Sequence, residues 1–494
     1  MRPDSFNLAE YVLTSALADP EKTALSVLCP TKGTDNWSFA RLVSAVRGTA
    51  TGLLAQGLRP GDFVLLRLGN TPQFPIAYLG AIAAGLVPVP TAAMLTARDV
   101  AGIIDTLRPA AILQDPDVPC PPSDRIIGRD ALQAMQQLPA AAWHRSDPDR
   151  LGYIIYTSGT SGKPSAVMHA HRAILARRFM FDGWYGLRPT DRLLHAGAFN
   201  WTYTLGTGLM DPWTIGATAL IPAPGTSAQD LPVLLRRHHA SIFAAAPGVY
   251  RQMLPDDGPL DLPDLRHGLS AGEKLPASVL DRWTSATGTP IYEAYGMSEC
   301  STFISGCPAH PARAGTLGQP QGGRRITIRD ETGETAVDAV GTIAVHKSDP
   351  GLMLGYYGDP EGTKKRYHGD WFMTGDQGAR DQDGQIAYLG RADDMMNAGG
   401  FRVSPLEVEA ALSRMPGITT VGVTQVEVKP DVWVIAAFYT GPAALEDTAL
   451  HGFASESLAR YKQPRLYMHL TSLPTGANGK LQRRALRAIY KETR

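Results

Sequence analysis

The loop at residues 156–164 constrains the fold and chemistry of this chain more than any other segment. An apolar run, residues 152–156, leads into a loop of small hydroxyl residues, glycines and one lysine. Its members are Thr157, Ser158, Gly159, Thr160, Ser161, Gly162 and Lys163. Glycine lets backbone amides approach an anion closely, while the hydroxyl groups and the lysine add hydrogen-bond donors. The loop therefore predicts a cradle for nucleotide phosphates.

Two other interpretations of this loop have to be weighed. A Walker A loop needs a glycine five residues before its last glycine and a Ser or Thr after the lysine. Thr157 and Pro164 occupy those two positions, which excludes that pattern. A flexible Ser/Gly surface linker has a similar composition. Four further segments of the chain argue against a linker.

Length and charge limit the architecture and the partners. The chain has 494 residues, too many for one ordinary core, so we expect two or three domains. Its 47 basic and 47 acidic residues balance, and its hydrophobic content is that of a globular protein. This balance predicts neither a nucleic-acid partner nor binding to an anionic membrane.

The sequence predicts neither secretion nor a membrane span. Residues 1–18 lack the basic stretch followed by a continuous apolar run that is typical of a signal peptide. The longest apolar run, residues 76–89, is shorter than the roughly 20 residues needed to cross a bilayer. The four cysteines are Cys29, Cys120, Cys300 and Cys307. Their spacing is neither that of metal ligands nor that of a disulfide framework, so we expect reduced, buried thiols. We expect a cytoplasmic enzyme.

Strand and helix patterns alternate in the first part of the chain. Residues 62–68 and 86–89 are expected to form strands, and residues 74–84 a helix between them. This alternation predicts an α/β fold with layered, largely parallel sheets. Residues 341–389 change to short strands and glycine turns, which predicts a β-rich subdomain.

The last hundred residues have the pattern of a small α+β domain. A helix is expected at 405–413, with Ser404 as its cap and Pro405 at its first position. A hairpin at 421–439 and a second helix at 445–461 follow. We expect an N-terminal domain at 1–390, a hinge at 391–393 and a mobile C-terminal domain at 394–494.

Two segments carry groups suited to a nucleotide. In residues 292–299, an aromatic ring can stack on adenine, a hydroxyl can meet a phosphate, and a carboxylate can hold Mg²⁺. These groups are Tyr295, Ser298 and Glu299. In residues 371–376, the carboxylate of Asp376 can accept two hydrogen bonds from ribose hydroxyls. Taken alone, each segment is also explained as an ordinary turn.

Two more segments lie nearer the C-terminus. Arg391 could reach ribose or phosphate, and the paired glycines Gly399 and Gly400 would let a thin ligand pass close to the backbone. Residues 474–480 present Lys480 from a glycine-rich loop. A lone lysine in such a place is usually a solvated surface charge.

In this order, the five segments resemble the motifs of the adenylate-forming superfamily, which contains acyl-CoA synthetases, adenylation domains that load carrier proteins, and beetle luciferases. The resemblance covers almost the whole chain, as far as Arg487. The chain is most similar to stand-alone acid–CoA ligases of benzoate or medium-chain acyl type. This implies ATP, Mg²⁺ and coenzyme A as cofactors and substrates, and a small carboxylic acid as the other partner.

The resemblance also implies a role for each matching residue. Residues 157–163 correspond to the phosphate loop, and Glu299 to the Mg²⁺ ligand. The predicted catalytic residues are Lys480, Glu299 and Ser298. The predicted adenine contacts are Gly272, Glu273, Lys274, Tyr295 and Gly296. Asp376 and Arg391 are expected to hold the ribose, Asp393 to act as hinge, and Gly399 and Gly400 to border the pantetheine channel.

The resemblance places the acyl pocket at residues 195–206 and at the floor formed by Ala294. Its expected members are His195, Phe199, Trp201, Tyr203, Gly206 and Ala294. Bulky aromatic side chains suit a compact aromatic acid or a short to medium acyl group and leave little room for a long alkyl chain. Aromatic residues at these spacings are equally common in an ordinary core.

The chain departs from the family pattern at three positions. Ser165 stands where a second lysine is usual in the phosphate loop, and Ser298 replaces the usual threonine while keeping the hydroxyl. Asn397 replaces a lysine that is common after the hinge. The first and third changes each remove a positive charge that could position the nucleotide or coenzyme A.

Several functions stay open at this point. The thiol acceptor can be free coenzyme A or a separate carrier protein. A luciferase-like oxygenase would share the same motifs, and a non-catalytic nucleotide-binding protein is not excluded by them. A P-loop kinase is disfavoured by Pro164 and would release ADP instead of AMP. The sequence also leaves a homodimer open.

Overall fold

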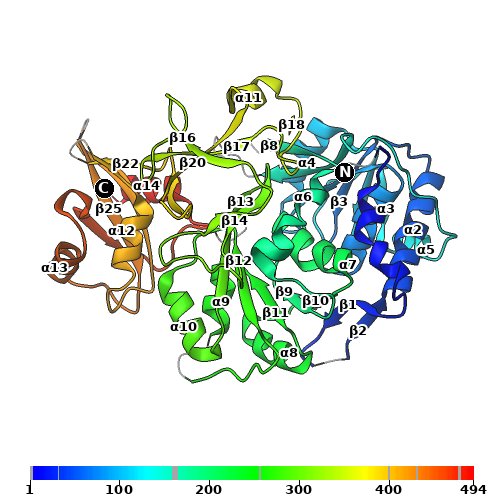
Figure 1. Cartoon of the computed structure of the whole chain (residues 1–494), viewed down its shortest axis with the longest axis horizontal. Helices are drawn as coiled ribbons and strands as arrows, with labels where there is room; N and C mark the ends of the chain where they lie inside the picture. Colours follow the sequence, from blue (N-terminus) through cyan, green and yellow to red (C-terminus); the bar gives the residue numbers. More distant parts are fainter. Residues whose placement is uncertain are drawn as a thin grey trace.

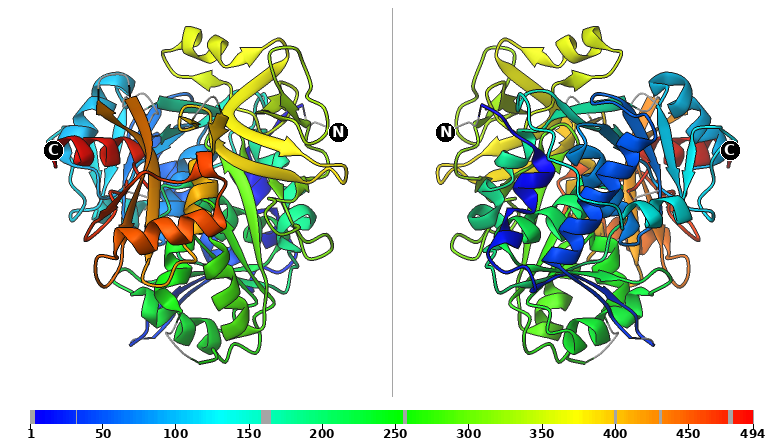
Figure 2. Two further views of the ribbon diagram at one scale, coloured as in Figure 1. Left: turned by 90° about the vertical axis from the view of Figure 1, so that its left-hand side faces the viewer. Right: turned by 90° about the vertical axis from the view of Figure 1, so that its right-hand side faces the viewer.

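The computed structural model describes residues 4–31, 33–157, 165–254, 258–398, 401–429, 432–476 and 480–493. Figure 1 shows a large body of layered sheets and helices, with a small unit, coloured orange to red, at its left end. The left view of Figure 2 shows this small unit in front of the larger body. The layered α/β fold expected from the sequence is confirmed.

A four-stranded parallel sheet, in the order β4-β3-β5-β6, forms one layer of the larger body. Its strands are β3 (Phe63–Arg67), β4 (Val87–Pro90), β5 (Ala111–Gln114) and β6 (Ile126–Gly128). The predicted helix at 74–84 is α3 (Gln73–Ala83), and all its residues are buried. It contacts α1 (Leu8–Val12), α2 (Phe39–Ala55) and β4, because a helix that is apolar on every side must be covered on every side.

A nine-stranded sheet, in the order β15-β14-β13-β12-β11-β9-β10-β1-β2, forms the centre of the molecule. Its strands are β1 (Thr23–Leu28), β2 (Asp35–Ser38), β9 (Arg192–His195), β10 (Thr218–Pro222), β11 (Ile242–Ala245), β12 (His267–Ala271), β13 (Ile291–Met297), β14 (Ser301–Ser305) and β15 (Gln319–Pro320). The six inner strands are parallel, and antiparallel strands close both edges. The carboxyl ends of β12 and β13 therefore lie side by side at one edge.

The predicted β-rich subdomain is a five-stranded antiparallel sheet. It contains β16 (Ile326–Arg329), β17 (Val340–His346), β19 (Tyr367–His368), β20 (Trp371–Arg380) and β21 (Ile386–Arg391). A separate antiparallel sheet joins β7 (Leu151–Thr157), β8 (Ser165–Ala170) and β18 (Gly355–Tyr356). Residues 158–164 of the predicted phosphate loop, between β7 and β8, lie outside the described residues.

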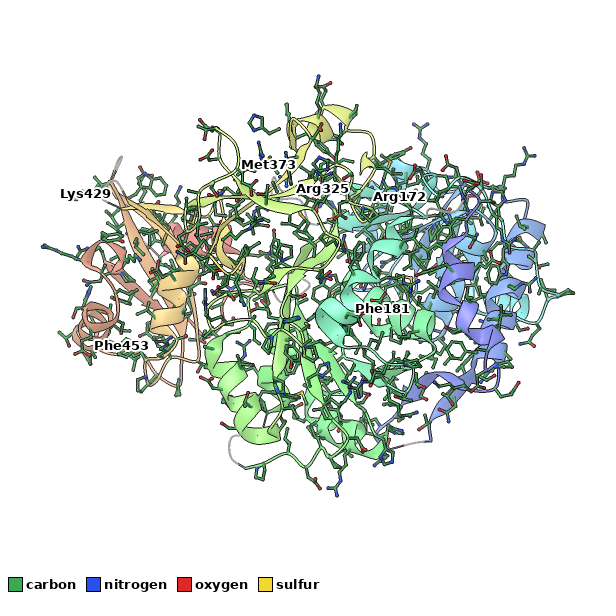
Figure 3. The ribbon with its side chains drawn as sticks, in the orientation of Figure 1. Arg172, Phe181, Arg325, Met373, Lys429 and Phe453 are labelled. Atoms are coloured by element: carbon green, nitrogen blue, oxygen red, sulfur yellow. The ribbon has the colours of Figure 1, made fainter. Side chains whose placement is uncertain are left out.

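The small unit contains the predicted hairpin, formed by β24 (Thr420–Lys429) and β25 (Val432–Thr440), with β26 (Leu466–His469) parallel to β25. Its other elements are β22 (Met396–Ala398), β23 (Phe401–Val403), α12 (Pro405–Leu412), α13 (Asp447–Ser457) and α14 (Arg483–Glu492). Figure 3 shows Lys429 and Phe453 in this unit, and Met373 of β20 in the larger body.

Two details of this unit differ from the sequence predictions. The helix expected at 445–461 is shorter, because the Leu445 amide donates to the Tyr439 hydroxyl and Leu458 is already extended. Ser404 precedes α12 but does not cap it with its side chain. Its hydroxyl instead donates to the carbonyl of Leu389 at 2.6 Å, which joins the start of α12 to β21.

The remaining helices have the following bounds. They are α4 (Ala97–Leu107), α5 (Arg129–Met135), α6 (Ala173–Ala176), α7 (Asp211–Ile215), α8 (Leu231–Arg237), α9 (Pro247–Met253), α10 (Ala277–Thr287) and α11 (Pro360–Lys365). Short 3₁₀ turns occur at Thr14–Leu17, Ala228–Asp230 and Arg460–Lys462. Two π-helical segments, Phe181–Tyr185 and Thr204–Met210, flank the central sheet.

The residue after the predicted hinge is tied to the small unit by Arg483 of α14. Its guanidinium lies 3.7 Å from the Asp394 carboxylate and makes two hydrogen bonds, at 2.7 and 2.8 Å, to Glu409 of α12. One guanidinium nitrogen, Nη2, contacts both carboxylate oxygens, and charge-assisted hydrogen bonds of this kind restrain both side chains. Asp394, α12 and α14 are therefore held together as one group.

The burial of the cysteines and the apolar character of the helices bear on two further predictions from the sequence. Cys300 and Cys307 are buried as expected, but Cys29 and Cys120 are only partly buried. Within the residues that the structure describes, no helix is both long and apolar enough to cross a membrane.

Candidate active site

Segments that are far apart in the sequence meet at the carboxyl edge of the central sheet. Tyr295 lies near the end of β13, and its hydroxyl donates to Asp376 of β20 at 2.5 Å. Asp376 is paired in register with Arg391 of β21. Residues 272–274 follow β12, the neighbour of β13. The structure thus brings together most of the predicted nucleotide-binding segments outside the phosphate loop.

Asp376 is a buried carboxylate with several donors around it. Besides Tyr295, the Tyr388 hydroxyl lies 3.4 Å from its Oδ1, and a guanidinium nitrogen of Arg391 lies 3.5 Å from the same oxygen. Burial raises the pKa of Asp376, while the charges of Arg391 and Lys480 and the phenol of Tyr295 oppose that rise. Two carboxylate oxygens with about four lone-pair sites leave capacity for further donors.

Lys480 belongs to the same neighbourhood although its side chain is exposed. It adjoins the isolated bridge between Thr475 and Leu481, and its charge lowers the pKa of Asp376 and of Glu273. Burial acts in the opposite direction on Glu273 and raises its pKa overall. Lys480 of the small unit is therefore near enough to this edge for its charge to act on two of the predicted site carboxylates.

Ser298 and Glu299 form a turn between β13 and β14 that is held from several sides. The His169 ring donates from Nε2 to the Ser298 carbonyl at 2.7 Å, and the Tyr356 hydroxyl donates to Oε1 of Glu299 at 2.7 Å. Because His169 lies on β8 and Tyr356 on β18, this turn is joined to the sheet that flanks the phosphate loop.

Glu299 is partly exposed, and one of its carboxylate oxygens is not used by Tyr356. Among the described residues there is no group of three or more His, Cys, Asp or Glu side chains that could hold a metal ion. A single protein carboxylate together with substrate phosphates is a usual set of Mg²⁺ ligands. The donor set therefore fits a magnesium ion that arrives with a nucleotide.

The segment after β12 is shaped by one glycine. Gly272 has φ of +97°, and a Cβ at this position would lie 2.3 Å from the ring of Trp201. Trp201 therefore packs directly over the Gly272 backbone. Lys274 lines a cleft of about 310 Å³ together with residues of β21 and α12.

The predicted acyl-pocket residues divide into two groups. Trp201, Tyr203 and Ala294 lie in one apolar cluster, in which the Tyr203 ring is 5.2 Å from Trp201. The Tyr203 hydroxyl donates to the Leu269 carbonyl of β12 at 3.0 Å. Phe199 does not join them; it is buried against Phe74 in the N-terminal core.

His195 and Gly206 are both buried beside this cluster. His195 Nδ1 accepts from the Gly197 amide, and Nε2 has no hydrogen-bond partner among the described residues. Burial, with a smaller effect of the Arg177 charge, lowers the pKa of His195 to about 3, so the ring is neutral. A Cβ on Gly206 would lie 2.2 Å from the guanidinium of Arg177.

Some predicted site residues lie outside what the structure describes. These are residues 158–163 of the phosphate loop and the pair Gly399 and Gly400; for Thr157 only the backbone, paired with Ser165, is described. Gly296 is described and has no room for a side chain, because a Cβ would lie 2.2 Å from the Ser301 carbonyl oxygen. Asp393 accepts from Arg391 Nε at 3.3 Å.

Two phenols contact the site and were not singled out in the sequence. Tyr356 reaches Glu299, and Tyr388 reaches Asp376. The only sequence signal for them is proximity to other motifs: Tyr356 lies in a glycine turn, and Tyr388 precedes Gly390 and Arg391. Their partners are distant in sequence, which no local pattern reveals.

Glu293 should make the stability of the protein depend on pH. Its carboxylate accepts from the Leu275 amide at 2.7 Å, yet burial raises its pKa to about 7 from an ordinary value near 4.5. Between about pH 4.5 and 7 the folded state therefore holds more protons than the unfolded state, so stability falls as pH rises. We expect Glu293→Gln to flatten the plot of thermal midpoint against pH in this range. Glu334→Gln is the control, because the Glu334 carboxylate is exposed. An unchanged slope would contradict the assignment.

A family model and several known proteins match this chain. The family model described as AMP-binding enzyme matches residues 13–357. A 3-hydroxybenzoate–CoA/4-hydroxybenzoate–CoA ligase of Thauera aromatica is 30% identical over 523 aligned residues, covering 99% of this chain and 98% of the relative.

Solved structures of similar proteins extend over the whole chain. A structure of an anthranilate CoA ligase in complex with anthranoyl-AMP has a TM-score of 0.88 at 26% identity, covering 99% of this chain and 98% of the other. ATP-bound MatB from Rhodopseudomonas palustris has a TM-score of 0.89 at 26% identity and covers 99% and 100% of the two chains. Both are similar in fold from end to end.

Proposed function

The chain belongs to the family of AMP-binding enzymes, and from that membership we propose that it is an acid–CoA ligase that joins a small carboxylic acid to coenzyme A with ATP as energy source. The relatives named as hydroxybenzoate–CoA and anthranilate CoA ligases support an aryl acid. The observation that carries the proposal is the cluster of Tyr295, Asp376 and Arg391 within range of the Lys480 charge.

In the first proposed step the acid becomes an acyl adenylate. A carboxylate oxygen of the acid attacks the α-phosphorus of ATP, a new P–O bond forms, and pyrophosphate leaves with the electron pair of the broken P–O bond. Asp376 would accept from the ribose hydroxyls, and Tyr295 would stack beside the adenine. Lys480 would stabilise negative charge that develops on the phosphoryl oxygens, since such steps depend on positioning and charge. Mg²⁺, held by Glu299 with the phosphates, would supply further charge neutralisation.

In the second proposed step the acyl group passes to a thiol. The sulfur attacks the carbonyl carbon of the adenylate, a C–S bond forms, the C–O bond to phosphate breaks, and AMP leaves, while the thiol proton goes to solvent. Lys480 at the phosphate would obstruct the incoming thiol. We therefore also propose that residues 394–494 rotate about Asp393, against residues 1–390, between the two steps.

The proposed acid pocket is bounded by Trp201 and Tyr203. Trp201 packs over Gly272, and Tyr203 is fixed through its hydroxyl to Leu269. Two fixed aromatic rings favour a compact, flat acid over a long alkyl chain. Phe199 lies in the N-terminal core and is not part of this proposal.

Trp201→Ala should enlarge the range of acids. Removing the ring opens space over Gly272, so we expect kcat/KM for benzoate to fall about 10-fold, while bulkier acids such as naphthoate gain by a similar factor. The measurement is pyrophosphate release over an acid panel. Trp433→Ala is the matched control, because Trp433 is an exposed tryptophan on β25. An equal loss for all acids would contradict a role for Trp201 in selection.

The proposed function is tested by pyrophosphate release from ATP and Mg²⁺ with aryl and short to medium aliphatic acids, with and without coenzyme A. We expect turnover that rises with coenzyme A and gives AMP and a thioester. Pyrophosphate release that coenzyme A does not accelerate would indicate a carrier protein as acceptor. Release of ADP, or no release with any acid, would contradict the proposal.

A further inference from the structure

A buried ion pair lies between the proposed acid pocket and the turn that carries Glu299. Arg177, directly after α6, donates from Nε to Asp211 Oδ1 at 2.8 Å and from Nη2 to Oδ2 at 2.6 Å. Asp211 is the first residue of α7, and both side chains are at least nine-tenths buried. The Tyr185 hydroxyl donates to the same carboxylate at 2.8 Å.

The same guanidinium also contacts both functional segments. Nη1 donates to the Ser301 hydroxyl at 2.6 Å, and Nη2 to the Thr207 hydroxyl at 3.2 Å. Ser301 begins β14 directly after the turn with Ser298 and Glu299. Thr207 lies in the π-helical segment Thr204–Met210, next to the acid-pocket residues. One rigid, planar group thus bonds to both segments. Figure 1 labels α6, α7 and β14, the elements in or next to which Arg177, Asp211 and Ser301 lie.

Both segments have backbone shapes that need support from outside. Ser301 has φ of +62°, which is uncommon for a residue other than glycine. A π-helical segment is rare and is often found at functional sites. Gly206 lets this segment lie against Arg177, where a Cβ would be 2.2 Å from the guanidinium. Unfavourable backbone shapes persist only where their surroundings hold them.

Stability alone does not explain this arrangement. Replacing a buried ion pair by well-packed apolar side chains is often neutral or stabilising, so its presence is weak evidence for a role in stability. What an apolar cluster cannot provide is a fixed set of directional bonds to Asp211, Ser301 and Thr207. The bonds fix the position of the turn relative to the acid-binding segment.

We propose that Arg177 is a positioning residue that couples the acid pocket to the turn bearing Glu299, so that binding of the acid and of the Mg²⁺–nucleotide complex strengthen each other. This inference rests on the proposed function of the two sites. Binding of the acid fixes the conformation of the π-helical segment. Because Thr207 in that segment and Ser301 beside the turn bond to the same guanidinium, the position of the turn is then fixed as well. The turn in this position holds Glu299 in place for the metal. By linkage, the effect on affinity is the same in both directions.

The coupling is measured by binding, without turnover. Calorimetry gives the dissociation constant of Mg²⁺ with α,β-methylene-ATP for the full chain, with and without the acid that the pyrophosphate assay identifies as best. For the wild type we expect the acid to strengthen nucleotide binding about 5- to 150-fold. Ser301→Ala and Thr207→Val should each reduce this factor to below about 3-fold, and the double variant should reduce it no further, because both bonds belong to one link.

Ser305→Ala is the matched control, since Ser305 lies on the same strand but donates to the Gly183 carbonyl and not to Arg177. Thermal midpoints close to the wild type show that the variants fold. Two results would overturn the inference: variants that keep the wild-type factor, or a wild type in which acid and nucleotide bind independently. In either case, thioester formation would still support the proposed function. A wild type that forms no adenylate with any acid would instead overturn the proposed function, and the inference with it.

Discussion

Replacing Lys480 with alanine is expected to stop adenylate formation and leave thioester formation from a supplied acyl adenylate nearly intact. In the structure the lysine is exposed, yet its charge acts on Asp376 and Glu273 at the edge of the central sheet. A cation in this place stabilises the phosphoryl charge of the first step and has no partner in the second. Loss of one such donor typically costs about 10²- to 10³-fold in rate.

The measurement for Lys480→Ala is a comparison of two rates on one preparation. Pyrophosphate release from ATP and acid reports the first step, and thioester formation from synthetic acyl adenylate and coenzyme A reports the second. Lys491→Ala provides a matched control, because Lys491 is an exposed lysine in the last turn of α14 in the same unit. If both rates fell equally, the role assigned to Lys480 in the first step would be wrong.

Asp376→Ala should weaken ATP binding about 100-fold or more. The carboxylate is buried among Tyr295, Tyr388 and Arg391 and is proposed to accept from both ribose hydroxyls. Hydrogen bonds to a charged group contribute about 1.5–3 kcal/mol each, so the loss of two such bonds exceeds a factor of 100. The variant also leaves Arg391 without its buried partner, so a lower thermal midpoint is expected.

A nucleotide analogue separates the lost contact from a general loss of structure. The wild type should prefer ATP over 2′,3′-dideoxy-ATP by about the same factor, because the analogue lacks both hydroxyls. Asp376→Ala should bind the two nucleotides alike. Tyr388→Phe removes only the long 3.4 Å contact to the same carboxylate and should keep the discrimination. A variant that still distinguished the two nucleotides would exclude Asp376 as the ribose acceptor.

Patterns within single segments predicted much of this architecture. The strands at β3 and β4, the buried helix α3 and the hairpin of β24 and β25 all follow from local apolar patterns and turn residues. Tyr295 and Asp376 could be singled out because glycine, aromatic and carboxylate residues lie close together in short segments. Parallel strands then bring the segments after β12 and β13 to one edge.

Long-range contacts set the limits of prediction from sequence. Phe199 and Trp201 are both apolar aromatic residues, but Phe199 packs against Phe74 and Trp201 packs over Gly272. Only the three-dimensional structure decides which of these contacts each residue makes. Ser404 has the sequence of a helix cap, but a carbonyl on β21 competes for its hydroxyl. In each case the deciding partner is distant in sequence.

The contact of Arg483 with Asp394 and Glu409 has a consequence for the construction of hybrid enzymes. Because this guanidinium fastens the residue after the hinge to α12 and α14, a recombination point placed after Asp394 would take one partner from each parent. A junction before Asp394 keeps the three side chains from a single parent. Exchange of the C-terminal segment between relatives is therefore expected to preserve folding when the crossover lies at Asp393 or earlier.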